Sequence, residues 1–122
     1  MLENFYGIIE EKQMPQRFQV RIKLNPQHVI YQAHFPGNPI TPGVCILQMC
    51  QELIERNTGR TLQMVNAKNI KFLNILSPQL HPEPLFTVEY TEIGEGIKAS
   101  VTLSDEVIVF AKISVEYHGY NR

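Results

Sequence analysis

A stretch rich in proline and glycine lies directly before the one long apolar helix expected of this chain. It runs from His34 to Val44 and reads His-Phe-Pro-Gly-Asn-Pro-Ile-Thr-Pro-Gly-Val. Prolines fix φ and remove backbone donors, whereas glycines allow backbone conformations that other residues rarely adopt. We therefore expect a strand that ends at His34, a rigid turn, and a helix that starts at once. This arrangement would hold an imidazole beside helix amides that have no acceptor within the helix.

The expected helix runs from Thr41 or Pro42 to Asn57. Thr41 suits the N-cap, Pro42 suits the first helical position, and Gly59 is a typical stop. Apolar residues occupy most sides of this segment, so we expect the helix to be buried on nearly all faces. A narrow polar stripe at helical spacing consists of Gln48, Gln51, Glu52 and Glu55.

Strands are expected on both sides of the helix, at residues 5–11, 17–24, 28–33, 62–73, 85–93, 97–103 and 107–117. Residues 17–24 alternate cleanly between polar and apolar, which predicts a half-buried strand. Its inward face would carry Phe18, Val20, Ile22 and Leu24. A hairpin is expected across residues 94–96. One apolar helix with five or six antiparallel strands indicates an α+β domain, and wrapping the sheet around the helix is the simplest way to bury that helix.

Composition narrows the classes of function. The chain has 122 residues and a net charge of -1, so one domain over residues 1–122 is expected and the basic surplus typical of nucleic-acid binding is missing. Neither a signal peptide nor an apolar run of membrane-spanning length stands out, so we expect a cytoplasmic protein that does not enter a membrane. A core this small has a thin stability margin, which favours pairing with a second subunit.

The cysteines and histidines do not indicate a metal site or a cofactor. Cys45 and Cys50 are five residues apart on the expected helix, so their thiols point in different directions and are expected to be small core residues. The four histidines lack the spacing of metal ligands. They are His28, His34, His81 and His118.

The segment from His34 to Val44 resembles the 3-hydroxyacyl-acyl carrier protein dehydratases of fatty-acid synthesis. In that family an HFPGxPxxPGV segment leads into a helix that carries a glutamate or aspartate. The resemblance implies a hotdog fold, an antiparallel sheet wrapped around one long central helix. It also implies that His34 is the base that takes the α-proton of a 3-hydroxyacyl thioester. The thioester would bind near the amides of Gly43 and Val44, and the active site would lie between two subunits.

The chain departs from the family pattern at Gln48, where the catalytic acid is expected. An amide donates and accepts hydrogen bonds but transfers no proton at neutral pH. Glu52 lies one helical turn further along the same face. It is either a displaced acid or a solvated helix residue. Of the phenylalanines, Phe35, Phe72, Phe86 and Phe110 are expected to be core residues, some of which can line an acyl tunnel.

Three functions are compatible with these residues. The first is a dehydratase acting on acyl carrier protein thioesters, weakened as a homodimer because Gln48 replaces the acid. The second is a non-catalytic acyl-thioester-binding subunit, or the heterodimer partner of an active dehydratase. The third is a hotdog thioesterase, although that reaction usually needs a carboxylate to activate water.

Overall fold

The computed structural model describes residues 2–34 and 37–120. Phe35 and Pro36, which belong to the predicted turn, lie outside the described residues. Within the described part, six antiparallel strands form one sheet in the order β1-β2-β4-β5-β6-β3. The elements are β1 (Tyr6–Met14), β2 (Arg17–Leu24), α1 (Val29–Ala33), α2 (Gly43–Thr58), β3 (Thr61–Phe72), β4 (Leu85–Ile93), β5 (Gly96–Ser104) and β6 (Val109–Tyr120).

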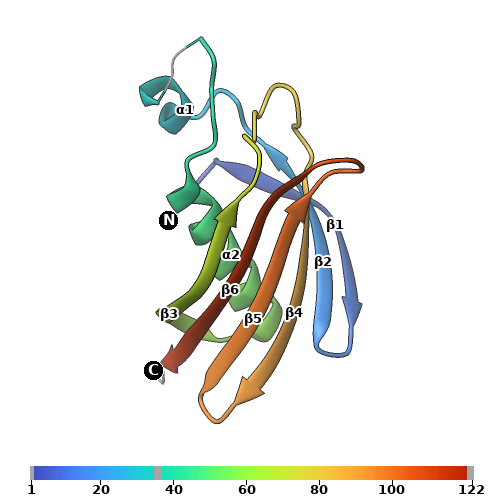
Figure 1. Cartoon of the computed structure of the whole chain (residues 1–122), viewed down its shortest axis with the longest axis vertical. Helices are drawn as coiled ribbons and strands as arrows, with labels where there is room; N and C mark the ends of the chain where they lie inside the picture. Colours follow the sequence, from blue (N-terminus) through green and yellow to red (C-terminus); the bar gives the residue numbers. More distant parts are fainter. Residues whose placement is uncertain (1, 35–36, 121–122) are drawn as a thin grey trace.

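Helix α2 lies along one face of the curved sheet, and the core fills the space between them (Figure 1). The helix buries its sheet-facing residues, which are Cys45, Ile46, Met49, Cys50, Leu53 and Ile54. The predicted alternation of β2 is confirmed, since its four inward residues are at most 2% exposed. The prediction that both cysteines belong to the core is confirmed as well. Burial of this apolar surface is the main force that holds the helix on the sheet.

Local sequence signals predict one end of α2 correctly and miss the other by one residue. Gly59 adopts φ 69° and its amide donates to the carbonyl of Glu55 at 2.9 Å, so the predicted stop is confirmed. The predicted N-cap is wrong by one residue, because Pro42 occupies that position without a side-chain cap. The Thr41 hydroxyl is instead paired with the buried hydroxyl of Tyr31, 2.8 Å away.

Two other predictions are wrong. Residues 28–33 form no strand: Val29–Ala33 is the short helix α1, whose first turn is capped by the side chain of His28 accepting from the amide of Ile30 at 3.1 Å. Burial of α2 on nearly all faces is also not found. Its face away from the sheet is open, with Val44 74% exposed.

The hairpin between β4 and β5 is confirmed, with Gly94 at φ 59°. The expected core positions of Phe86 and Phe110 are confirmed too, since both are at most 1% exposed. Phe72 is half exposed, so it is not a core residue. Phe35 lies outside the described residues.

Candidate active site

His34 is exposed at the end of α1, on the connection that leads to α2. Its backbone amide donates to the carbonyl of Ile30 at 3.0 Å. Further along, Gly37 adopts φ 87°, a conformation that favours glycine. The amide of Thr41 donates to the carbonyl of Leu76 at 2.9 Å, which ties the end of the connection to the rest of the molecule. No hydrogen bond joins the imidazole of His34 to another residue in the described part of the chain.

The N-terminus of α2 presents backbone donors. The amides of Cys45 and Ile46 donate to the carbonyl of Pro42, at 3.0 and 3.2 Å. The amides of Gly43 and Val44 have no acceptor among residues 2–34 and 37–120. They are therefore available to an oxygen atom of a ligand, and the helix dipole adds partial positive charge at this end.

An apolar groove of about 350 Å³ lies beside these amides. It is lined by Ile40, Thr41, Pro42, Gly43, Ile46 and residues 72–76. The ring of Phe72 lies over Gly43, where an added Cβ would come within 2.7 Å of its Cζ atom. The missing side chain of Gly43 thus allows Phe72 to form one wall of the groove. Phe72 and Ile75 are 50% and 64% exposed, so the groove is open to an apolar ligand.

On the open face of α2, Gln48 is joined to Glu52. The Nε2 atom of Gln48 donates to Oε2 of Glu52 at 3.1 Å. The same carboxylate also accepts from the Tyr6 hydroxyl at 2.9 Å and from the Leu2 amide at 3.2 Å. The start of β1 is therefore fastened to the middle of α2. Burial, followed by the hydrogen bond to Glu52, raises the pKa of Tyr6, so its phenol stays protonated as a donor.

The structure thus places two of the predicted groups on α2, and the third, His34, lies apart from them. Gly43 and Val44 form the donor end, and Gln48 lies on the face of α2 that continues from Val44. His34 makes no described contact with either group. The helical spacing of Gln48 and Glu52 predicts their contact, but no sequence signal links Tyr6 to them.

Sequence reasoning also missed a paired histidine. His81 Nδ1, on the connection between β3 and β4, lies 2.6 Å from Oδ2 of Asp105, on the connection between β5 and β6. Asp105 Oδ1 further accepts from the amides of Val107 and Ile108, and these bonds, together with His81, lower the pKa of Asp105. The pair joins two loops at one end of the sheet, which is a structural role.

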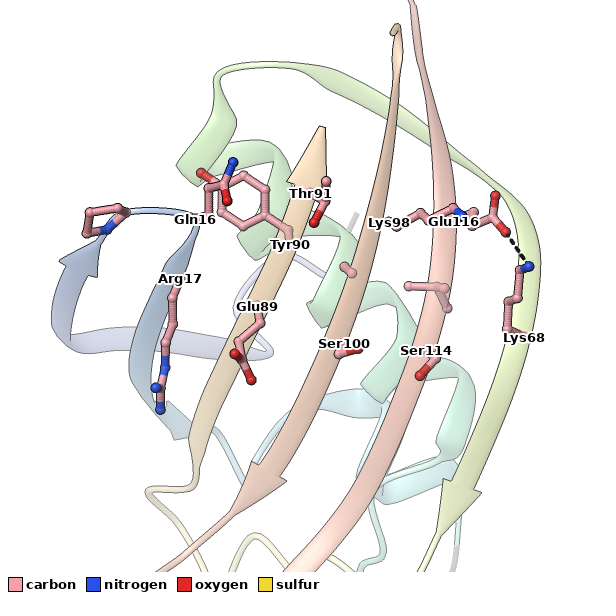
Figure 2. Close-up of a pocket in the computed structure, with 13 residues that line it drawn as sticks. Gln16, Arg17, Lys68, Glu89, Tyr90, Thr91, Lys98, Ser100, Ser114 and Glu116 are labelled. Carbon is pink, nitrogen blue, oxygen red and sulfur yellow. Dashed lines mark ion pairs between the residues drawn. The ribbon is translucent and has the colours of Figure 1, made fainter. Parts of the chain in front are cut away.

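A larger groove of about 560 Å³ lies on the sheet face opposite α2 (Figure 2). Its polar residues point away from the core, because they alternate with the buried Ala99 and Val115. Charges of both signs line it, and Lys68 pairs with Glu116 at 3.1 Å. It lacks the helix amides and the apolar wall found beside Gly43, so we do not place the active site there.

Two further findings concern the described residues alone. Among them, no group of three histidine, cysteine, aspartate or glutamate side chains is placed to hold a metal ion. None of the helices described there has the length and apolar character needed to cross a membrane.

Comparisons with known proteins identify the family of this chain. The family model described as "ApeI-like: ApeI dehydratase" matches residues 10–109. The 3-hydroxyacyl-[acyl-carrier-protein] dehydratase FabZ of Latilactobacillus sakei is 30% identical over 103 residues, which cover 77% of this chain and 73% of that protein.

Solved structures show the same fold. The dehydratase heterocomplex ApeI:P from Xenorhabdus doucetiae superposes with a TM-score of 0.73 at 18% identity, over 91% of this chain and 96% of the other. A hypothetical thioesterase with coenzyme A from Streptococcus pneumoniae gives a TM-score of 0.64 at 14% identity, over 100% of this chain and 92% of the other. The predicted hotdog fold is thereby confirmed. Because the family model spans residues 10–109, this chain belongs to the ApeI-like dehydratase family.

Proposed function

We propose that this protein is a (3R)-hydroxyacyl-[acyl carrier protein] dehydratase-like protein of fatty-acid or related acyl-chain synthesis. One observation carries the proposal: the connection that bears His34 leads straight into a helix end with two free amides, beside an apolar groove. An acyl thioester has the matching parts. Its carbonyl oxygen accepts from the amides of Gly43 and Val44, and its chain lies in the groove along Phe72.

The proposed reaction removes water from a 3-hydroxyacyl thioester. His34 takes a proton from the α-carbon, the electron pair of that C–H bond forms the new C=C bond, and the bond from C3 to the hydroxyl oxygen breaks. The leaving oxygen takes up a proton from solvent and departs as water, and His34 returns its proton to solvent. The amides of Gly43 and Val44 stabilise the negative charge that develops on the thioester oxygen.

The proton for the leaving oxygen is the weak point of the site. Gln48 stands where the family resemblance places an acid, and an amide has no proton to give at neutral pH. Loss of a positioned acid costs about 10²–10⁴-fold in rate. We therefore propose slow dehydration by this protein alone.

The site is completed by a second subunit in this proposal. Val44 is 74% exposed beside Gln48, and Val65 is 60% exposed on the edge strand β3. Unpaired backbone groups on an edge strand are a template for pairing with another chain. A dimer that continues the sheet through β3 would bring His34 of one subunit toward Gln48 of the other.

A related hotdog subunit with an intact acid is the alternative partner. In such a heterodimer, one of the two sites would combine His34 with a true carboxyl group. The name of the similar Xenorhabdus doucetiae structure describes a dehydratase heterocomplex, which supports this arrangement. Acyl carrier protein is the proposed donor of the acyl chain in both cases.

The test is an assay of the purified protein with 3-hydroxyacyl, enoyl and saturated acyl thioesters of acyl carrier protein. We expect slow interconversion of the first two, and loss of this activity in His34→Ala with the fold retained. Binding without turnover would identify a non-catalytic subunit. Release of free acid with free carrier thiol would identify a thioesterase, and either result would refute the dehydratase proposal.

A further inference from the structure

The hydrogen bond between Gln48 and Glu52 determines which end of the Gln48 amide is free. A glutamine side chain has a donor end and an acceptor end of nearly the same shape, and its hydrogen-bond partners decide which way it points. Here Nε2 is bound to the Glu52 carboxylate, an acceptor. The carbonyl atom Oε1 has no partner among residues 2–34 and 37–120. It is the end that remains available to a ligand.

Glu52 is itself held in place. One of its oxygens accepts from the Tyr6 hydroxyl, and the other accepts from the Leu2 amide and from Gln48. These partners come from three separate positions on β1, the N-terminal segment and α2. All three donate, so Glu52 acts as an acceptor in this arrangement. It can receive the N–H of Gln48 but presents no hydrogen of its own.

The free end of Gln48 lies on an accessible face. Val44, Gln48 and Glu52 are spaced four residues apart, so they form one stripe along α2 that begins at the free amides. Val44 is largely exposed and Gln48 is half-buried. At its other end, the stripe reaches a shallow cleft of about 450 Å³ lined by Tyr6 and Glu52. The carbonyl oxygen of Gln48 thus lies on a face that is open to the second subunit of the proposed dimer, whose acyl chain it would meet.

We propose that Glu52 is a positioning residue that turns the carbonyl oxygen of Gln48 toward the 3-hydroxyl group of the acyl chain. The proposal rests on the proposed function for the identity of the substrate. A hydroxyl can donate to this oxygen, whereas a 3-oxo group only accepts and a saturated C3 does neither. The site therefore selects the hydroxyl form by hydrogen bonding, even though it supplies no proton.

The experiment measures the affinity of the full-length protein for three probes. Each is acyl carrier protein loaded through an amide linkage, which resists hydrolysis, with a chain of one fixed length that is 3-hydroxy, 3-oxo or saturated at C3. We expect wild-type protein to prefer the 3-hydroxy probe over the 3-oxo probe by about tenfold, because an acceptor facing an acceptor is left unpaired. Binding of the saturated probe tests whether the protein is folded and whether the groove accepts the acyl chain, because a saturated C3 makes no hydrogen bond with Gln48.

Glu52→Leu frees the amide of Gln48 to turn, so the ratio of the two affinities is expected to fall toward one while the saturated probe binds as before. Glu52→Gln is expected to keep most of the preference, because its carbonyl oxygen accepts the same N–H. Glu55→Leu is the matched control. Glu55 lies on the same helix and accepts from the Leu62 amide at 2.8 Å, away from Gln48. Its loss is therefore expected to leave the ratio unchanged.

The outcomes are distinguishable from those of the proposed function. A Glu52→Leu protein that keeps the wild-type ratio overturns the role of Glu52, and Glu52→Ala serves the same test if the leucine variant fails to fold. The role of Glu52 is also refuted if wild-type protein binds all three probes with equal affinity, a result that would still support acyl binding. If wild-type protein binds none of the probes, the proposed function itself fails and this inference falls with it.

Discussion

Replacing Gln48 by glutamate tests the missing-acid account most directly. The side chains are nearly isosteric, so the packing of α2 changes little. Position 48 would then hold a carboxyl group about 3.1 Å from the carboxylate of Glu52, the distance that now separates Nε2 from Oε2. The new group cannot be treated as an isolated acid.

The magnitude of this coupling follows from the distance. Two unit charges 3.1 Å apart repel by about 1 kcal/mol in bulk water and by about 5 kcal/mol at an effective dielectric constant of ~20. The pair is half-buried, so the repulsion lies between these limits. The carboxyl at position 48 therefore keeps its proton to a higher pH than a free glutamate does. A carboxyl that is still protonated near neutral pH is suited to general acid catalysis.

We expect Gln48→Glu to raise the dehydratase activity of the protein alone by tenfold or more, a low estimate for a positioned acid. The assay follows dehydration of a 3-hydroxyacyl carrier-protein thioester through the ultraviolet absorbance of the enoyl product, over a range of pH. Because the protonated form is the active one, the gain is present at low pH and is lost as pH rises and the shared proton leaves. The double variant Gln48→Glu/Glu52→Gln removes the repulsion, so its gain is expected to vanish at a lower pH.

Gln51→Glu is the matched control for added charge. Gln51 is on the same helix but donates to the carbonyl of Leu62 at 2.9 Å, away from Gln48. If Gln48→Glu keeps its circular dichroism and melting temperature yet is no more active than Gln51→Glu, the missing acid does not explain the site. The pocket would then be better interpreted as a binding site.

Three further predictions address assembly, the groove and stability. Analytical ultracentrifugation at micromolar concentration is expected to show a dimer, and a monomer would contradict a site shared between subunits. Gly43→Ala forces the Phe72 ring off its present position, because the added Cβ would lie 2.7 Å from Cζ. We expect weaker acyl binding, measured by titration, with little loss of stability in thermal melts. Asp105 has a lowered pKa, so its contribution to stability is present above its ordinary pKa of 3.8 and is lost as pH falls through the lowered value. Asp105→Asn keeps an oxygen for both backbone amides but cannot titrate, so its melting temperature is expected to fall less between neutral and acid pH; equal slopes would refute this.

Much of the fold could be predicted from local patterns. The alternation in β2 identified all of its buried residues, because a strand with one face in the core has a period of two. Gly59 marked the end of α2 because a left-handed residue is needed there. The sheet wrapped around the helix followed from a single apolar helix among strands.

The errors arose where a tertiary contact competes with a local preference. Residues 28–33 have strand-like composition, yet His28 caps a helical turn and Tyr31 is buried against Phe5, with ring centroids 5.0 Å apart. Thr41 is a good N-cap in isolation, but its hydroxyl is paired with Tyr31. The open face of α2 exposes Val44 beside the half-buried Gln48 and Glu52. This surface is consistent with the proposed partner subunit.

Sequence patterns predict only part of the candidate site, because one of its contacts joins residues far apart in the chain. Gln48 and Glu52 are one helical turn apart, so their contact is a local matter. The position of the Glu52 carboxylate also depends on Tyr6, which is 46 residues from Glu52 in the chain and contacts it only in the folded protein. The change at Gln48 is therefore not an isolated loss of an acid. It belongs to an amide–carboxylate pair in which Nε2 of Gln48 is bound to Glu52 and the carbonyl oxygen of Gln48 has no partner among residues 2–34 and 37–120. In the proposed dimer such a site binds the hydroxyl and eliminates water slowly, and fast elimination needs a carboxyl group from a second subunit.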